Sequence, residues 1–229
     1  MYIPGILNGL KNMTLNLQKN IMSTSLSQNK DRLQNSESKG VKFKFSAILF
    51  LIVCFIYANT LKNGFVLDDA IVNTDNMFTS KGLSGIGGLW KYDTFYGFFK
   101  EEGKANLVTG GRYRPFTPTQ FAIEQSIFGQ KPWVGHLFNI LWFGFLCVGI
   151  FLVLILMLES RKIQMPVWIS FFTTLLFAVH PVHTEVIANI KGRDEIMAFM
   201  GCVAAWWIIW RYRENLTIWN QLAIGVTFF

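Results

Sequence analysis

The feature that most constrains this chain is a continuous apolar run over Val134–Leu158, which contains no Asp, Glu, Lys or Arg. An α-helix rises about 1.5 Å per residue, so a helix of this run covers roughly 37 Å, more than the ~30 Å hydrocarbon core of a bilayer. We therefore expect Val134–Leu158 to form a membrane-spanning helix.

The rest of the sequence also favours a membrane protein. Charged residues make up 15% of the 229-residue chain, whereas a soluble domain carries about 25%. Further apolar segments cover about residues 45–61, 167–179, 196–210 and 218–229. The sequence therefore predicts an all-α integral membrane protein, built as a multi-span helical bundle.

The distribution of basic residues predicts the topology. Residues 1–44 form a polar, basic arm, in which Lys42 and Lys44 directly precede the first apolar segment. The short loops ESRK and RYRE, after the second and fourth segments, each carry a net positive charge. Because cytoplasmic loops are enriched in Lys and Arg, we expect the arm and both loops in the cytoplasm. The long first loop and residues 180–195 are then exoplasmic. Topology accounts for the net charge of +7, so no nucleic-acid partner is expected.

The first loop, about residues 62–133, is too polar for lipid and too aromatic for a linker. It holds eight Lys or Arg and seven Asp or Glu, together with many Phe, Tyr and Trp. Segments of this kind form helices that lie at the membrane surface. We expect short interfacial helices in this exoplasmic loop, and we treat residues 45–229 as one membrane domain that follows the flexible arm.

Two adjacent acids, Asp68 and Asp69, follow the first apolar segment and have apolar neighbours. A poorly solvated carboxylate binds its proton more tightly, and a like-charged neighbour strengthens the effect. Such a pair suits a general base for an acceptor hydroxyl, or a metal ligand. The alternative is a helix N-cap, a position that Asp favours.

Further along the same loop, the sequence GGRYRP presents Arg112 and Arg114 on either side of Tyr113. Arginine forks suit phosphate oxygens, and the phosphates of lipid-linked substrates lie at this depth. The alternative is that these side chains anchor the loop at the membrane interface.

The stretch HPVHTEVIANIKGRDE, residues 180–195, gathers ionisable groups at the end of the short third segment. His180 and His183 are three residues apart, whereas a zinc helix uses histidines four apart. A divalent metal is therefore possible but not favoured. The remaining readings are histidines that cap helix ends and an anionic-substrate site. The second reading uses the histidines with Arg193, oriented by the nearby acids Glu185, Asp194 and Glu195.

The motifs NGFVLDDAI, RYRPFTPTQFAIE, HLFNILWF and LLFAVHPVHTEVIANIKGRDE, in this order, resemble the GT-C membrane glycosyltransferases. The resemblance covers about residues 63–210. It is strongest to the transmembrane O-mannosyltransferases that carry tetratricopeptide repeats, and to their bacterial relatives.

The resemblance implies transfer of a sugar, mannose or a similar hexose, from a polyprenyl-phosphate donor to a protein Ser or Thr hydroxyl, with inversion, on the exoplasmic face. It implies that Asp68 and Asp69 hold the catalytic base. The residues then expected to bind the donor phosphate or substrate are Arg112, Arg114, His180, His183, Glu185, Arg193 and Glu195. Asp194 ranks lower, since its position is usually small in relatives.

The resemblance also implies a setting for the protein. The partners would be the polyprenyl-phosphate sugar, an acceptor protein and the lipid bilayer of a bacterial inner membrane or the endoplasmic reticulum. The resemblance assigns no cofactor, since the lipid-linked sugar is a substrate. The family has more spans than this chain, whose fifth segment stops at Phe229. We therefore expect an N-terminal fragment that lacks part of the donor groove. The alternatives are a non-catalytic membrane scaffold and a membrane metalloenzyme that uses the histidines.

Overall fold

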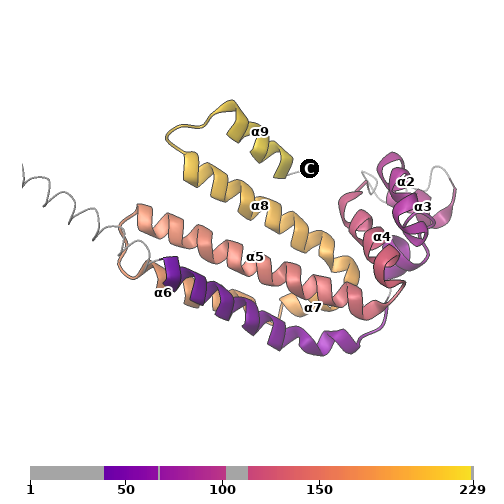
Figure 1. Ribbon diagram of the computed structural model, residues 1–229, viewed down its shortest axis with the longest axis horizontal. Helices are drawn as coiled ribbons and strands as arrows, with labels where there is room; N and C mark the ends of the chain where they lie inside the picture. The colour runs from indigo at the N-terminus through magenta and orange to yellow at the C-terminus, as the bar shows by residue number, and fades with distance from the viewer. Residues whose placement is uncertain (1–38, 67, 102–112, 228–229) are drawn as a thin grey trace, which may run out of the picture. The chain divides into compact units, whose positions relative to one another are not determined.

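The computed structural model describes residues 39–66, 68–101 and 113–227, and all regular structure in these ranges is helical (Figure 1). The prediction of an all-α fold is confirmed for this part of the chain. The arm over residues 1–44 and Arg112 fall wholly or largely outside the described ranges.

The long helices coincide with the five apolar segments. A helix over residues 39–57 continues into the 3₁₀ turn η1 (Ala58–Lys62) and is followed, after the first loop, by α5 (Pro132–Ser160), α6 (Pro166–Ala178), α8 (Arg193–Tyr212) and α9 (Ile218–Thr227). Two helices, Lys39–Lys62 and Pro132–Ser160, are long and apolar enough to cross a membrane. Membrane crossing by the other three helices stays a prediction.

Helix α5 is the centre of the bundle, with α6 and α8 packed along it. Glycine fits at Gly144 of α5 because the ring of Phe50, from the first helix, occupies the space that a Cβ would need. On the same side, Tyr57 donates a hydrogen bond from its hydroxyl to the carbonyl of Ala178 at 3.0 Å and meets the ring of Phe143 edge-on. These contacts join the first helix, α5 and the end of α6 into one core.

The outer faces of these helices are apolar and exposed. The large exposed side chains include Phe55, Phe145, Leu152, Phe172 and Leu176. A soluble protein rarely exposes large apolar patches, whereas lipid tails solvate apolar side chains without cost. The helices therefore present the surface of a membrane protein.

The first loop folds into short helical elements, as the sequence predicts. These are η2 (Ala70–Thr74), η3 (Thr79–Gly85), α2 (Ile86–Lys91), α3 (Thr94–Phe99) and α4 (Phe116–Phe128). The buried Asn76 joins η2, η3 and α3: its amide nitrogen donates to the carbonyls of Ile71 and Thr94, and its oxygen accepts from the N–H groups of Phe78 and Thr79. That these helices lie at the membrane interface stays a prediction.

The stretch between α6 and α8 does not continue α6. Helix α6 ends at Ala178, a turn follows, and the chain forms α7 (His183–Ala188) and the 3₁₀ turn η5 (Ile190–Gly192). This compact connection packs on the first part of α5 and leads directly into Arg193 at the start of α8.

Candidate functional site

Asp69 is a buried link between the first loop and η5. Its carboxylate accepts a hydrogen bond from the N–H of Val66 through Oδ2 and another from the N–H of Lys191 through Oδ1, both at 2.9 Å. The residue is 0% exposed. Asp69 therefore ties together two segments that are 122 residues apart, and both its oxygens are occupied by backbone donors.

Asp68 is in a different environment, although it is the next residue. Its side chain is 48% exposed, and its Oδ2 lies 3.2 Å from Nζ of Lys191. One lysine thus contacts both acids, through its backbone N–H to Asp69 and its ammonium group to Asp68. Of the two carboxylates, that of Asp68 is open to an incoming molecule.

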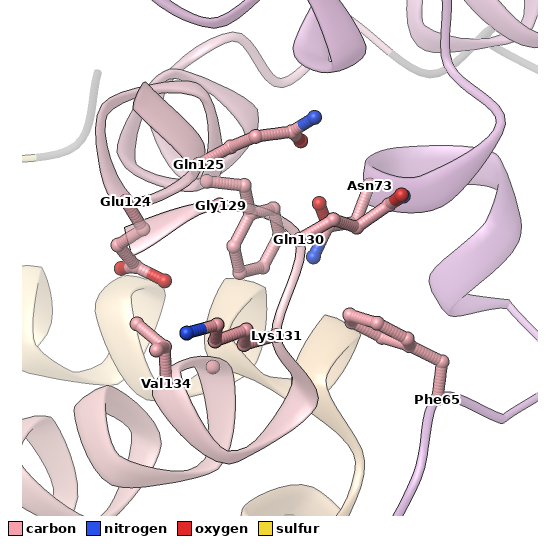
Figure 2. Close-up of a pocket in the computed structure, with 10 residues that line it drawn as sticks. Phe65, Asn73, Glu124, Gln125, Gly129, Gln130, Lys131 and Val134 are labelled. Carbon is pink, nitrogen blue, oxygen red and sulfur yellow. The ribbon is translucent and has the colours of Figure 1, made fainter. Parts of the chain in front are cut away.

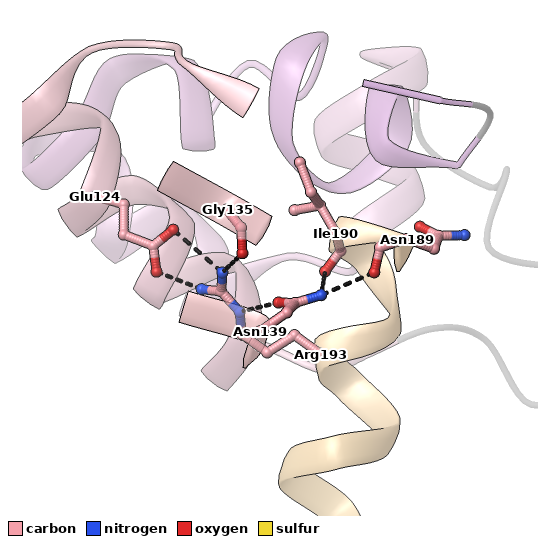
Figure 3. A network of polar contacts seen from close by, with 6 residues as sticks. All are labelled: Glu124, Gly135, Asn139, Asn189, Ile190 and Arg193. Carbon is pink, nitrogen blue, oxygen red and sulfur yellow. Dashed lines mark hydrogen bonds and ion pairs between the residues drawn. The ribbon is translucent and has the colours of Figure 1, made fainter. Parts of the chain in front are cut away.

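Arg193 is the centre of a buried polar network (Figure 3). Its side chain is fully buried and forms a two-pronged ion pair with the carboxylate of Glu124 on α4. It also donates from Nε to Oδ1 of Asn139 and from Nη2 to the carbonyl of Gly135, both at 2.9 Å. Its guanidinium carbon lies 4.4 Å from the centre of the Phe121 ring. Most of its N–H groups are satisfied within the protein, which indicates a positioning role; that Arg193 binds substrate stays a prediction.

Asn139 links Arg193 to the backbone of the connection that contains Lys191. Its amide nitrogen donates to the carbonyl of Asn189 at 2.8 Å and lies 3.3 and 3.4 Å from those of Ile190 and Ile187. Buried carbonyl groups need such partners, because an unmade buried hydrogen bond costs about 1–3 kcal/mol. The network thus fixes the backbone on the N-terminal side of Lys191, and through it the pairing with Asp68 and Asp69.

Two opposing effects act on the charge of Glu124. Burial raises the pKa of the Glu124 carboxyl, and the neighbouring Arg193 guanidinium lowers it, with burial the larger effect. A buried carboxylate of this kind depends on its partner to stay ionised. Glu124 also borders a small pocket, lined in addition by Phe65, Asn73, Gln125, Gln130 and Lys131 (Figure 2).

Gly192 is required where η5 meets α7, because a Cβ there would overlap the carbonyl oxygen of Val186. We expect Gly192→Ala to destabilise the protein by about 1–3 kcal/mol, the usual cost of overpacking, which lowers the melting temperature by several degrees. Thermal unfolding in detergent measures the effect. Gly87→Ala in α2 is the control, since a Cβ there has nothing within 4 Å and Ala favours a helix over Gly. Equal melting temperatures for the two variants would show that the contact with Val186 does not constrain residue 192.

The rings of the two histidines of the connection lie 6.2 Å apart, centre to centre, but have different surroundings. His180 is exposed, and its Nδ1 accepts a hydrogen bond from the N–H of Val182 at 3.3 Å. The ring of His183 lies 4.3 Å from that of Phe177 and 5.4 Å from that of Phe143. Burial, followed by the proximity of His180, lowers the pKa of His183, so it packs as a neutral aromatic ring. Among the described residues, no group of three or more His, Cys, Asp or Glu side chains could hold a metal ion.

The remaining predicted residues lie at the surface. Arg114 is 62% exposed at its side chain, and its Nη1 is 3.7 Å from Oδ2 of Asp194. Glu185 and Glu195 are exposed. The structure thus brings Asp68, Asp69 and Arg193 close to one short connection and links Arg114 to Asp194, the acid that the sequence ranked lower. Substrate contacts by each of these residues stay predictions.

Three residues of the site had no role in the sequence analysis: Glu124, Asn139 and Lys191. Glu124 and Asn139 could have been noticed, because each lies among mostly apolar residues, in FAIEQSIF and HLFNILWF. Polar side chains in such surroundings are retained for function or for pairing. Nothing in the sequence singles out Lys191, because only the folded structure places it next to both acids.

Comparisons with known proteins identify relatives. The chain is 29% identical over 190 residues to human protein O-mannosyl-transferase TMTC3, covering 81% of this chain and 19% of that protein. It is 31% identical over 156 residues to mouse TMTC1, covering 67% and 15%, and 35% identical over 157 residues to mouse TMTC4, covering 64% and 20%. The chain spans about a fifth of the length of these relatives or less.

No protein-family model and no solved structure matches the chain. The resemblance that the motifs indicate is nevertheless confirmed by several relatives that carry the same family name. Over the matched residues, this chain belongs to the TMTC family of protein O-mannosyl-transferases.

Proposed function

We propose that the protein containing this chain transfers mannose, or a similar hexose, from a polyprenyl-phosphate donor to a Ser or Thr hydroxyl of an acceptor protein. The transfer takes place with inversion on the exoplasmic face of a multi-span GT-C-like membrane domain, whose N-terminus is cytoplasmic. The names of the relatives support sugar transfer to protein. The apolar helices support a membrane location.

The observation that carries the proposal is the environment of Asp68. A general base needs a carboxylate that the acceptor hydroxyl can reach. The side chain of Asp68 is half-exposed and is held in place by Lys191, whereas Asp69 is buried with both oxygens occupied. Asp68 is therefore the base, and Asp69 is a positioning residue that holds the loop of Asp68 against η5.

The reaction is a single displacement. The Asp68 carboxylate takes the proton from the acceptor hydroxyl, the oxygen forms a bond to the anomeric carbon, and the bond from that carbon to the phosphate oxygen breaks. The electron pair leaves with the polyprenyl phosphate. Attack from the side opposite to the leaving group inverts the configuration.

The departing phosphate requires positive charge. Lys191 supplies an ammonium group 3.2 Å from the base, and Arg114 offers an exposed guanidinium. Arg112 is expected to add positive charge, and His180 and His183 are expected to hydrogen-bond the phosphate, while Glu185 and Glu195 are expected to orient the substrate. Arg193 acts through Asn139 on the backbone that carries Lys191.

The test is sugar transfer by the complete protein in which this chain occurs. Purified protein is given either polyprenyl-phosphate mannose or a nucleotide-activated mannose, together with an acceptor protein. We expect transfer from the lipid-linked donor only, and a product whose anomeric configuration, determined by NMR, is opposite to that of the donor. Transfer from the nucleotide sugar in lipid-free detergent, or a product with retained configuration, would refute the proposal.

A further inference from the structure

We propose that the ends of α5 and α8 that lie farthest from Asp68 form a binding site for the phosphate group of an anionic membrane phospholipid. The two helices pack side by side and run in the same direction (Figure 1). Asn139 of α5 meets Arg193 at the start of α8, and Ser160 of α5 meets Trp210 at its end. This inference does not depend on the proposed function.

The length of α5 indicates where the proposed phospholipid site lies across the membrane. From Asn139 to Ser160 the helix rises roughly 31 Å, at about 1.5 Å per residue, which is close to the ~30 Å thickness of the hydrocarbon core. The polar network around Arg193 and the pair of Ser160 and Trp210 therefore lie near opposite membrane surfaces. The second site is at the level of the lipid headgroups, on the side that the basic loops predict to be cytoplasmic.

A hollow of about 380 Å³ opens at this end of the two helices. It is lined by aromatic rings, polar groups and arginines, which come from Ser160, Trp210, Arg211, Tyr212, Arg213 and Asn215. A phosphate group with the adjoining glycerol carbons fits such a mixture, because the charged oxygens and the apolar carbons each find matching partners.

Trp210 is held in one orientation at this hollow. Its Nε1–H donates to Oγ of Ser160 at 3.0 Å, and the Ser160 hydroxyl donates to the carbonyl of Met157 at 2.7 Å. The guanidinium carbon of Arg213 lies 5.2 Å from the centre of the Trp210 ring, and that of Arg161 lies 5.8 Å from it. Stacking on an aromatic face leaves the N–H edges of a guanidinium available.

Two arginines presented on a fixed indole are suited to phosphate oxygens. Guanidinium forks bind phosphate by two parallel hydrogen bonds, and Trp is favoured at the headgroup level. Among the described residues, Glu214 is the one acid that lines the hollow. Its Oε1 lies 3.7 Å from Nη2 of Arg213, and its side chain is 82% exposed, so the two form a weak surface ion pair. Basic pockets between helices on the cytoplasmic side bind anionic headgroups.

A simpler explanation is that these arginines only set the orientation of the protein in the membrane. The two explanations differ in what they require. Orientation depends on the number of positive charges, so any basic residue of the loop counts equally. A binding site depends on Arg161, Arg213 and the uncharged Trp210 together.

The test measures lipid retention by the complete protein. The protein is purified from mixed micelles of phosphatidylserine and phosphatidylcholine, and bound lipids are counted by native mass spectrometry. We expect a preference for phosphatidylserine that falls about fivefold in Arg213→Gln and again by a similar factor when Arg161→Gln is added. Trp210→Leu, which leaves the charge unchanged, is expected to reduce the preference as well.

Lys162→Gln is the matched control, because it removes one positive charge next to Arg161, whereas Lys162 neither lines the hollow nor is among the cations recorded over the Trp210 ring. An equal loss in Lys162→Gln, or no loss in Trp210→Leu, would overturn the proposal in favour of simple orientation by charge. Glycerol phosphate that displaces the lipid at equal concentration would also overturn it, since the ligand would then be a soluble phosphate.

Discussion

Asp68→Asn is expected to lower the rate of sugar transfer by roughly 10²- to 10⁴-fold, the usual contribution of a general base. Asparagine matches aspartate in shape but does not take up the proton of the acceptor hydroxyl. The side chain is half-exposed and its ion pair with Lys191 is a surface pair, so the free energy of unfolding should change by less than about 1 kcal/mol. Transfer assays on the complete protein, paired with thermal unfolding, measure both effects.

The same substitution one residue later should have a different outcome. In Asp69→Asn the amide NH₂ group replaces one acceptor oxygen, so the N–H of Val66 or that of Lys191 loses its buried partner. We expect a loss of about 1–3 kcal/mol of stability. Transfer activity should fall less than in Asp68→Asn, because Asp69→Asn affects the reaction only by displacing Asp68.

Asp75→Asn is the control for the loss of one negative charge, because Asp75 is an exposed acid of the same loop. Full activity in Asp68→Asn would exclude this residue as the base. An inactive Asp69→Asn that unfolds at the wild-type temperature would assign the base to Asp69 instead.

The sequence predicts the helical elements well because apolar runs and helices have the same physical cause. A helix satisfies its own backbone, so any long apolar segment in lipid adopts it. The run over Val134–Leu158 lies within α5, and nearly all described residues of the other apolar segments also lie in helices. Helix α6 ends at Ala178, one residue before the end of the third apolar segment.

The candidate site was predicted only in part, since it depends on contacts between distant segments. Adjacent acids in the sequence suggest one shared environment, yet the fold buries Asp69 and leaves Asp68 half-exposed. Likewise, an arginine beside two acids suggests a surface ligand, whereas Arg193 turns into the protein and pairs with Glu124, 69 residues away. No local sequence pattern predicts a partner that is so far away in the sequence.

Arg193→Met is expected to destabilise the protein by about 3–5 kcal/mol, the cost of leaving a buried charge without its partner. Methionine fills similar space but offers nothing to Glu124, Asn139 or Gly135, all of which accept hydrogen bonds from Arg193. Chemical unfolding in detergent measures the loss. Because the network holds the backbone before Lys191, the variant should also lose transfer activity.

The loss in Arg193→Met should depend on pH. Without the guanidinium only burial acts on Glu124, so the pKa of its carboxyl in the folded protein rises further above the unfolded value. A raised carboxyl pKa gives stability that is complete below the unfolded pKa and is lost as the pH rises through the folded pKa. The variant should therefore regain stability relative to wild type as the pH is lowered towards about 4.5.

A double-mutant cycle separates the ion pair from the packing around it. Glu124→Leu leaves Arg193 without its counter-charge, and Arg193→Met leaves Glu124 without its own, but the double variant contains neither charge. We expect the double variant to be more stable than the sum of the two single losses predicts, by about 1–3 kcal/mol. Strictly additive losses would mean that Glu124 and Arg193 do not stabilise each other. The buried network would then depend on Asn139 and Gly135 alone.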